Sequence, residues 1–262
     1  MTRRAYGSRL TTPYRPSPVR APPLDRFFGA RERRPAKGMA GIGKTSRDDR
    51  SGRPEGFAEP IPVGSDLRPD TSVTILIGGV PRSGKSSLAA ALGRKLRWPL
   101  VHSDQIAGAF RVPHAGNVTD PKQLFRLTQT AMLGYGAKQL KDFESSRIIE
   151  GTHFDPAAVA RHVTADPDRW CVAFLGYANI DVDEKIEMIR ATEGDRHAWT
   201  VHRSDEELRE NIELLVRQSA VRRTQCEEHG FAYFEIGRDH AEDLTRAANA
   251  ILEMIPDEAF RQ

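Results

Sequence analysis

The chain has 262 residues, of which 39% are hydrophobic and 29% are charged, and its formal net charge is +3. This size favours one globular domain with additional chain. No apolar run approaches the roughly 18 residues that a membrane span needs, and two distant cysteines, Cys171 and Cys226, predict neither a disulfide framework nor a zinc site. We therefore expect a reducing, cytoplasmic location without membrane association.

The basic residues are concentrated at the beginning of the chain. Residues 1–70 hold 15 of the 39 Lys and Arg residues, 8 of the 36 acidic residues and 10 of the 17 prolines. Such a segment buries too little apolar surface to offset its ordering entropy, so we expect a disordered extension followed by a domain over residues 71–262. The extension could be a solvated tail, an arm for nucleic acid or another acidic surface, or the result of a start assigned upstream of Met39.

A phosphate-binding loop (P-loop, Walker A motif) is predicted at the start of the domain. Residues 73–77 are large and apolar or β-branched, as in a strand covered on both faces, and residues 79–86 have the spacing Gly-x-x-x-x-Gly-Lys-Ser. Apolar residues then repeat at helical spacing at Leu88, Ala91, Leu92 and Leu96. In this context the loop amides turn toward an anion, and the positive end of the helix dipole points at it.

The motif assigns roles to the residues of the loop. We expect Lys85 to bridge the terminal phosphates of a nucleotide and Ser86 to hold Mg²⁺ through its hydroxyl. The expected nucleotide-binding residues are Gly79, Val80, Pro81, Arg82, Ser83, Gly84, Lys85, Ser86 and Ser87. A second match to the spacing, at residues 38–45, lacks both the preceding strand and the following apolar helix, so we interpret it as a chance match.

Polar residues follow the next two predicted strands, at residues 100–102 and 147–151. The carboxyl ends of strands form the ligand-binding edge of an open α/β sheet. Asp104 is therefore a candidate general base for an acceptor hydroxyl, although it could also cap a short helix over residues 105–110. Glu150 is expected to orient Mg²⁺ through water, and His153 could contact the substrate or serve in packing or capping.

A helix is predicted after Asp120, which has the position of an N-cap, followed by Pro121. Its expected buried face consists of Leu124, Leu127, Ala131, Met132 and Tyr135. Arg126 lies on the same helix, where it could reach an anionic acceptor or remain on a solvated face.

A segment that resembles a lid is predicted at about residues 190–204. It follows a predicted strand at 170–177 and the helix after that strand, and it precedes a long predicted helix that ends near Glu228. A lid excludes water and brings cationic groups to the transferred phosphoryl group, and Arg196 and Arg203 are the candidates for that role. The alternative is a mobile loop with solvated charges.

Ser204 and Glu207 form a predicted capping box at the start of the long helix. A strand at 231–236 and a helix at 241–254 complete the predicted domain.

The loop sequence 78–86, together with Val101–Asp104 and Ile148–His153, resembles the small P-loop kinases. This group includes nucleoside monophosphate kinases, shikimate and gluconate kinases, zeta toxins and chloramphenicol phosphotransferase. The segment Glu150–His153 followed by Pro156 is particularly similar to 2-phosphoglycerate kinases. The resemblance implies a three-layer α/β P-loop NTPase fold, with a five-stranded parallel sheet in the order 2-3-1-4-5 and helices on both faces. It also matches Asp104 to the acid that serves as base in several members.

These observations predict an ATP- and Mg²⁺-dependent kinase that phosphorylates a small hydroxylated or anionic metabolite. The chain lacks the arginine-rich lid motif of adenylate kinases and the Asn-Lys-x-Asp motif that reads guanine, which disfavours a nucleotide acceptor and a GTPase. Two alternatives remain open: an ATP-binding regulator or ATPase whose basic tail docks a partner, and a toxin-like kinase acting on a sugar nucleotide. Nucleic acid binding is expected only through the tail, and the sequence identifies neither the acceptor nor the oligomeric state.

Overall fold

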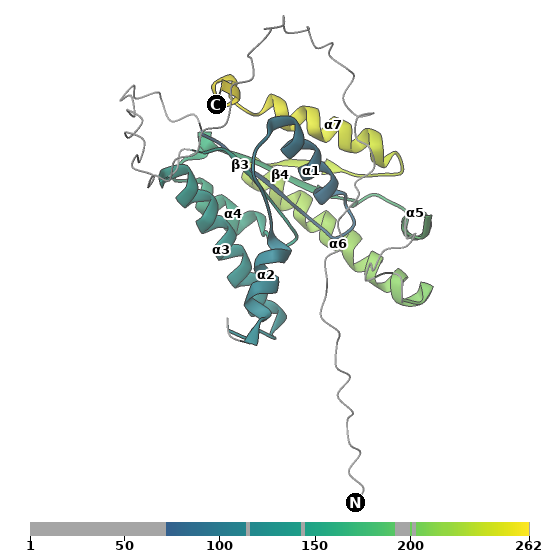
Figure 1. Cartoon of the computed structure of the whole chain (residues 1–262). Coiled ribbons are helices and arrows are strands. Elements are labelled where there is room, and N and C mark those ends of the chain that lie inside the picture. The colour runs from purple at the N-terminus through teal and green to yellow at the C-terminus, as the bar shows by residue number, and fades with distance from the viewer. Residues whose placement is uncertain (1–71, 114–115, 143–144, 192–199, 201–202, 262) are drawn as a thin grey trace, which may run out of the picture. The chain divides into compact units, whose positions relative to one another are not determined.

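The computed structural model describes residues 72–113, 116–142, 145–191, 200 and 203–261 (Figure 1). The predicted extension, the second loop-like match and most of the predicted lid, including Arg196, lie outside the described residues. Five strands form one parallel sheet in the order β2-β3-β1-β4-β5, which confirms the predicted fold class. The strands are β1 Thr74–Gly79, β2 Leu100–His102, β3 Arg147–Glu150, β4 Trp170–Gly176 and β5 Ala232–Glu235.

The central strand β1 pairs with β3 on one side and with β4 on the other. Every residue of β1 and of β4 is buried, whereas the residues of the edge strands β2 and β5 are only partly buried. Strands that are covered on both faces consist of nearly continuous apolar residues, which is why the sequence pattern identified β1 and β4.

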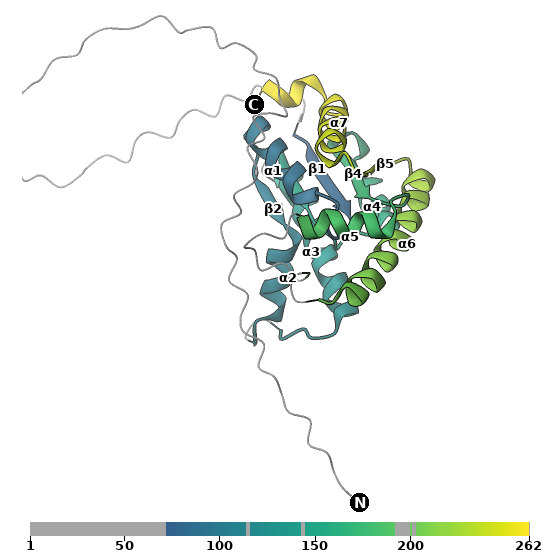
Figure 2. The ribbon, with the colours of Figure 1, turned by 90° about the vertical axis from the view of Figure 1, so that its right-hand side faces the viewer.

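Helices cover both faces of the sheet (Figures 1 and 2). Helices α1 and α7 contact each other on one face, and α4 contacts both α3 and α6 on the other. The helices are α1 Lys85–Leu96, α2 Ser103–Arg111, α3 Pro121–Asp142, α4 Pro156–Val163, α5 Val182–Ala191, α6 Asp205–His229 and α7 His240–Glu253, with short 3₁₀ helices at Pro167–Arg169 and Asp257–Arg261. None of the helices in the described ranges is long and apolar enough to cross a membrane.

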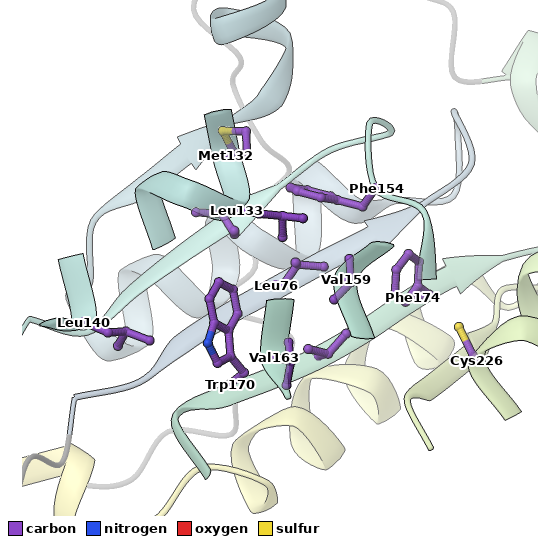
Figure 3. Close-up of a cluster of buried hydrophobic side chains, with 12 residues drawn as sticks. Leu76, Met132, Leu133, Leu140, Phe154, Val159, Val163, Trp170, Phe174 and Cys226 are labelled. Atoms are coloured by element: carbon purple, nitrogen blue, oxygen red, sulfur yellow. The ribbon is translucent and has the colours of Figure 1, made fainter. Parts of the chain in front are cut away.

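A large apolar core lies between the sheet and the helices α3 and α4 (Figure 3). Leu76 of β1 and Phe174 of β4 belong to this core together with Met132 of α3, Val159 of α4 and Phe154, which precedes α4. Each of these side chains is almost completely buried. Burying a side chain of this size stabilises the fold by about 1.5–3 kcal/mol. The core therefore fixes the strands whose carboxyl ends carry the site residues.

Side chains cap the helices where the sequence predicts them to begin. At α6, Ser204 Oγ accepts a hydrogen bond from the Glu207 amide (3.2 Å), and the Ser204 amide donates to the Glu207 carboxylate (3.0 Å). At α3, the Asp120 carboxylate accepts from the Gln123 amide at 2.9 Å. The capping box at Ser204 and the N-cap at Asp120 are confirmed.

Two local predictions are wrong. Helix α2 begins at Ser103 with His102 as its N-cap, so Asp104 lies inside the first turn and is not the capping residue. On α3, Leu127 is 36% exposed, and the buried face instead includes Thr128 and Gly136. Gly136 packs against β4, where a Cβ would lie 2.6 Å from the Trp170 ring. A small residue therefore occupies this buried position, which the apolar pattern of the sequence did not reveal.

Replacing Gly79 tests how tightly the end of β1 is packed. Gly79 has φ 137°, and a Cβ at this position would lie 2.0 Å from the Leu175 carbonyl oxygen. We expect Gly79→Ala to lower the free energy of unfolding by about 2 kcal/mol or more, because both the backbone conformation and the strand contact are strained. Chemical denaturation measures this change.

Gly134→Ala is the matched control. Gly134 lies inside α3, and a Cβ there would meet no atom within 4 Å. This substitution should raise the free energy of unfolding by about 0.5–1 kcal/mol, as expected for alanine in an exposed helix. A Gly79→Ala protein as stable as the parent would contradict the packing described for this strand end.

Candidate active site

The backbone of residues 79–84 turns sharply between β1 and α1. Gly79, Arg82 and Gly84 have positive φ values of 137°, 63° and 86°, and the Val80 amide donates a hydrogen bond to the Leu175 carbonyl at 3.2 Å. A turn that contains such residues can direct several N–H groups to one side and so form a concave anion-binding site. The loop therefore has the backbone character that its sequence predicts.

The N-terminus of α1 opens onto the same loop. Its first intrahelical hydrogen bond runs from the Leu88 amide to the Gly84 carbonyl at 3.0 Å. The amides of Lys85, Ser86 and Ser87 precede this bond and have no partner within the helix. Together with the helix dipole, these donors favour an anion at this position.

The Lys85 side chain is buried inside the loop. Its Nζ donates to the Val80 carbonyl oxygen at 2.5 Å and to Ser83 Oγ at 3.5 Å, and Ser83 Oγ donates to the same carbonyl at 2.9 Å. Burial lowers the pKa of Lys85 to about 8, although the nearby carboxylates of Glu150 and Asp104 favour the charged form. The ammonium group is therefore still mostly charged at pH 7.

Ser86 and Glu150 bring two oxygen atoms together beside the loop. Ser86 Oγ donates to Glu150 Oε1 at 3.3 Å; Ser86 is exposed, whereas only 4% of Glu150 is exposed. Mg²⁺ prefers oxygen ligands and is usually held by one or two protein oxygens together with substrate phosphates. The described residues contain no group of three or more His, Cys, Asp or Glu side chains that could hold a metal on its own. The Ser86–Glu150 pair thus fits Mg²⁺ held jointly with a nucleotide.

His102 is part of this arrangement, although the sequence did not single it out. Its Nδ1 donates to Glu150 Oε1 at 2.5 Å, and this hydrogen bond raises the pKa of His102 above its ordinary value. The contact follows from the sheet register, because His102 at the end of β2 lies opposite Glu150 at the end of β3. Register between two short strands is the signal that could have revealed it.

Asp104 and His153 come together at the neighbouring strand ends. His153 Nδ1 lies 2.9 Å from Ser103 Oγ and 3.7 Å from Asp104 Oδ1, and the His153 ring lies 5.7 Å from the ring of Phe125. Asp104 is 83% exposed, but only 14% of the His153 side chain is exposed. Burial lowers the pKa of His153 despite the opposing effect of Asp104, and the charges of Arg111 and Lys85 lower it further. His153 is therefore neutral at pH 7.

Helix α6 contributes an arginine that the sequence did not identify as a site residue. Arg222 Nη2 donates to the Thr152 carbonyl at 3.4 Å, while its buried Nη1 finds no hydrogen-bond partner among the described residues. Burial lowers the pKa of Arg222, and its charge contributes to the lowered pKa of Lys85. Its position in a long, highly charged helix gave no signal, because the contact depends on how α6 crosses the sheet.

Three further predicted cationic residues lie within the described part of the chain. Arg126 is exposed on α3, and Arg203 is exposed just before α6. Arg82 of the loop donates from Nη2 to the Thr200 hydroxyl at 3.1 Å, and Arg190 of α5 donates to the Thr200 carbonyl at 3.3 Å. Thr200, which belongs to the predicted lid, is thereby hydrogen-bonded to the phosphate loop and to α5.

The chain matches no protein-family model and no curated protein. Among solved structures it is similar to shikimate kinase from Bacteroides thetaiotaomicron, with 20% identity over 69% of this chain and 98% of that chain and a TM-score of 0.45. A gluconokinase from Sinorhizobium meliloti has 14% identity over 74% of this chain and 99% of that chain, with a TM-score of 0.44. Shikimate kinase from Acinetobacter baumannii, solved with shikimate, has 15% identity over 70% and 94%, with a TM-score of 0.45.

The arrangement of strands, loop and helix in this chain defines its fold class. A parallel sheet in the order 2-3-1-4-5, with a Gly-x-x-x-x-Gly-Lys-Ser loop between its central strand and the next helix, is the α/β fold of P-loop NTPases.

The hydrogen bond between His102 and Glu150 predicts a pH-dependent contribution to stability. Because the folded-state pKa of His102 is raised, this contribution is fully present below the unfolded pKa of about 6.5 and is lost as the pH rises through the folded pKa. The substitution His102→Gln should therefore lower the free energy of unfolding more at pH 6 than at pH 8.5. The pair is partly exposed, so we expect a difference below about 1 kcal/mol. Denaturation curves at the two pH values measure it, and a loss that is independent of pH would contradict the assignment.

Proposed function

We propose that the protein is an ATP-dependent kinase that phosphorylates a hydroxyl group of a small anionic metabolite. The observation that carries the proposal is the position of Lys85. It is buried within the phosphate loop, and its pKa responds to Glu150, Asp104 and Arg222, which come from three other parts of the fold. One charged group is therefore close to a metal-binding oxygen pair, to a candidate base and to a second cation.

The nucleotide would be held at the loop and at the start of α1. The N–H groups of the loop and the ammonium group of Lys85 would contact its phosphates, while Ser86 would hold Mg²⁺ through its hydroxyl and Glu150 would orient Mg²⁺ through water. Mg²⁺ bound there would neutralise charge on the terminal phosphates. The chain's own contribution is to orient the phosphates and to supply fixed positive charge, which is the main requirement of phosphoryl transfer.

The acceptor would lie between Asp104, His153 and Arg222. Its hydroxyl oxygen forms the new bond to the γ-phosphorus, the bond from that phosphorus to ADP breaks, and the hydroxyl proton passes to the Asp104 carboxylate. The exposure of Asp104 supports this role, because a carboxylate open to solvent can reach a small molecule. Neutral His153 can hydrogen-bond to the acceptor without adding charge.

The Nη1 of Arg222, which has no hydrogen-bond partner in the described part of the chain, supports an anionic acceptor. A buried guanidinium N–H without a partner costs free energy, which a carboxylate or phosphate on the acceptor would recover. We expect Arg222→Met to raise the KM for the acceptor by about tenfold or more while changing the affinity for MgATP less. Steady-state kinetics with the identified acceptor measure this. Equal KM values in parent and variant would exclude Arg222 from acceptor binding.

The acceptor can be identified by incubating the protein with MgATP and a mixture of metabolites. A kinase should produce one compound whose mass increases by one phosphate group, and ATP consumption should depend on that compound. Acceptor-independent ATP hydrolysis that disappears when residues 1–70 are deleted would favour an ATPase or regulator instead. Phosphorylation of a sugar nucleotide together with growth arrest on expression would favour the toxin-like alternative.

Substituting Asp104 tests its role as the base. Asp104→Asn should reduce the rate of phosphoryl transfer by about 10²–10⁴ while leaving nucleotide affinity nearly unchanged, because only proton transfer is affected. Asp168→Asn, an equivalent change of an exposed carboxylate in the 3₁₀ helix before β4, is the control and should have the parental rate. If Asp104→Asn also retains the parental rate, Asp104 is not the base.

A further inference from the structure

Two side chains from the region after β4 hold the outer side of the phosphate loop. Tyr177 Oη donates to the Pro81 carbonyl at 2.9 Å, and Lys185 Nζ, from α5, donates to the Arg82 carbonyl at 3.1 Å. Both side chains are almost completely buried, and Lys185 Nζ lies 4.3 Å from the centre of the Tyr177 ring. Neither residue belongs to the Gly-x-x-x-x-Gly-Lys-Ser motif.

The geometry of the peptide group links these two carbonyl contacts to the direction of the loop N–H groups. In a planar trans peptide, the carbonyl oxygen and the N–H of the following residue point in opposite directions. The described residues contain no cis peptide bonds. Bonds that hold the carbonyls of Pro81 and Arg82 from outside therefore direct the N–H groups of Arg82 and Ser83 to the opposite side of the loop.

The loop needs such support because its backbone is strained. Arg82 has φ 63°, a left-handed conformation that costs a residue with a side chain about 1–2 kcal/mol. A buried ammonium group is also costly unless it is hydrogen-bonded. Burial and the nearby charge of Arg82 lower the pKa of Lys185 to about 8, but its carbonyl acceptor and the aromatic face of Tyr177 both favour the charged form at neutral pH.

We propose that Lys185 and Tyr177 are positioning residues that preorganise the phosphate loop for the triphosphate of a nucleotide. They do not contact the phosphates; they act through the peptide groups at Pro81 and Arg82. The inference rests on the proposed binding of nucleotide at this loop but is independent of the acceptor. Without the two contacts, the loop would have to be ordered when the nucleotide binds, at the expense of affinity.

The test uses the full-length chain with Lys185→Met and Tyr177→Phe, which keep most of the buried volume and remove one hydrogen bond each. We expect Lys185→Met to weaken MgATP binding by about tenfold and Tyr177→Phe to weaken it by several-fold, as measured by titration calorimetry. Lys185→Arg should recover part of the loss, because a guanidinium group can still donate to the Arg82 carbonyl. Lys138→Met, an exposed lysine of α3, is the matched control and should bind like the parent.

The KM for ATP and the thermal midpoint separate positioning from a purely structural role. Positioning predicts a higher KM for ATP in both variants with a smaller change in kcat. A lower thermal midpoint with unchanged MgATP affinity would overturn the proposal. If Lys185→Met does not fold, the milder Tyr177→Phe decides: parental MgATP affinity in that variant overturns the proposal. If the parent itself binds no MgATP, the proposed function and this inference both fail, whereas normal binding in parent and variants alike rejects this inference only.

Discussion

The site depends on one constraint, which is that three residues between the end of β1 and the start of α1 keep a backbone conformation that side chains normally disfavour. Gly79 and Gly84 allow it, but Arg82 adopts it with a full side chain. Contacts from β4, from α5 and from Thr200 surround this segment. Because these contacts are made within the protein, binding of an anion as proposed would find its donors already directed, and the ordering cost would be met during folding.

The parallel sheet explains how the other groups reach this loop. Strands β1, β2 and β3 are neighbours and run in the same direction, so all of them end at the same edge. The loop after β1, His102 at the end of β2 and Glu150 at the end of β3 consequently meet, and the residues that continue from these ends include Asp104 and His153. The apolar core below determines the chemistry only indirectly, by fixing the register of the strands.

The sequence predicted those features that depend on local patterns. The buried run before Gly79, the loop motif and the capping box at Ser204 each involve residues within a few positions of one another, and each has a direct physical signature. His102, Lys185 and Arg222 were not predicted, because their partners lie 48, 103 and 70 residues away in the chain. These contacts depend on strand register and helix crossing, which the residue pattern does not encode. The buried face of α3 was mispredicted for a related reason, since Gly136 is buried by the shape of Trp170.

The central claim is that Lys85 and the surrounding amides bind the phosphates of a nucleotide. Titration calorimetry of the full-length protein with MgATP, compared with Lys85→Met and with the surface variant Lys138→Met, tests this claim most directly. We expect the parent and Lys138→Met to bind MgATP equally and Lys85→Met to bind about tenfold more weakly or worse, because a buried charge-assisted contact is removed. Absence of binding by the parent, or equal binding by Lys85→Met, would contradict the account.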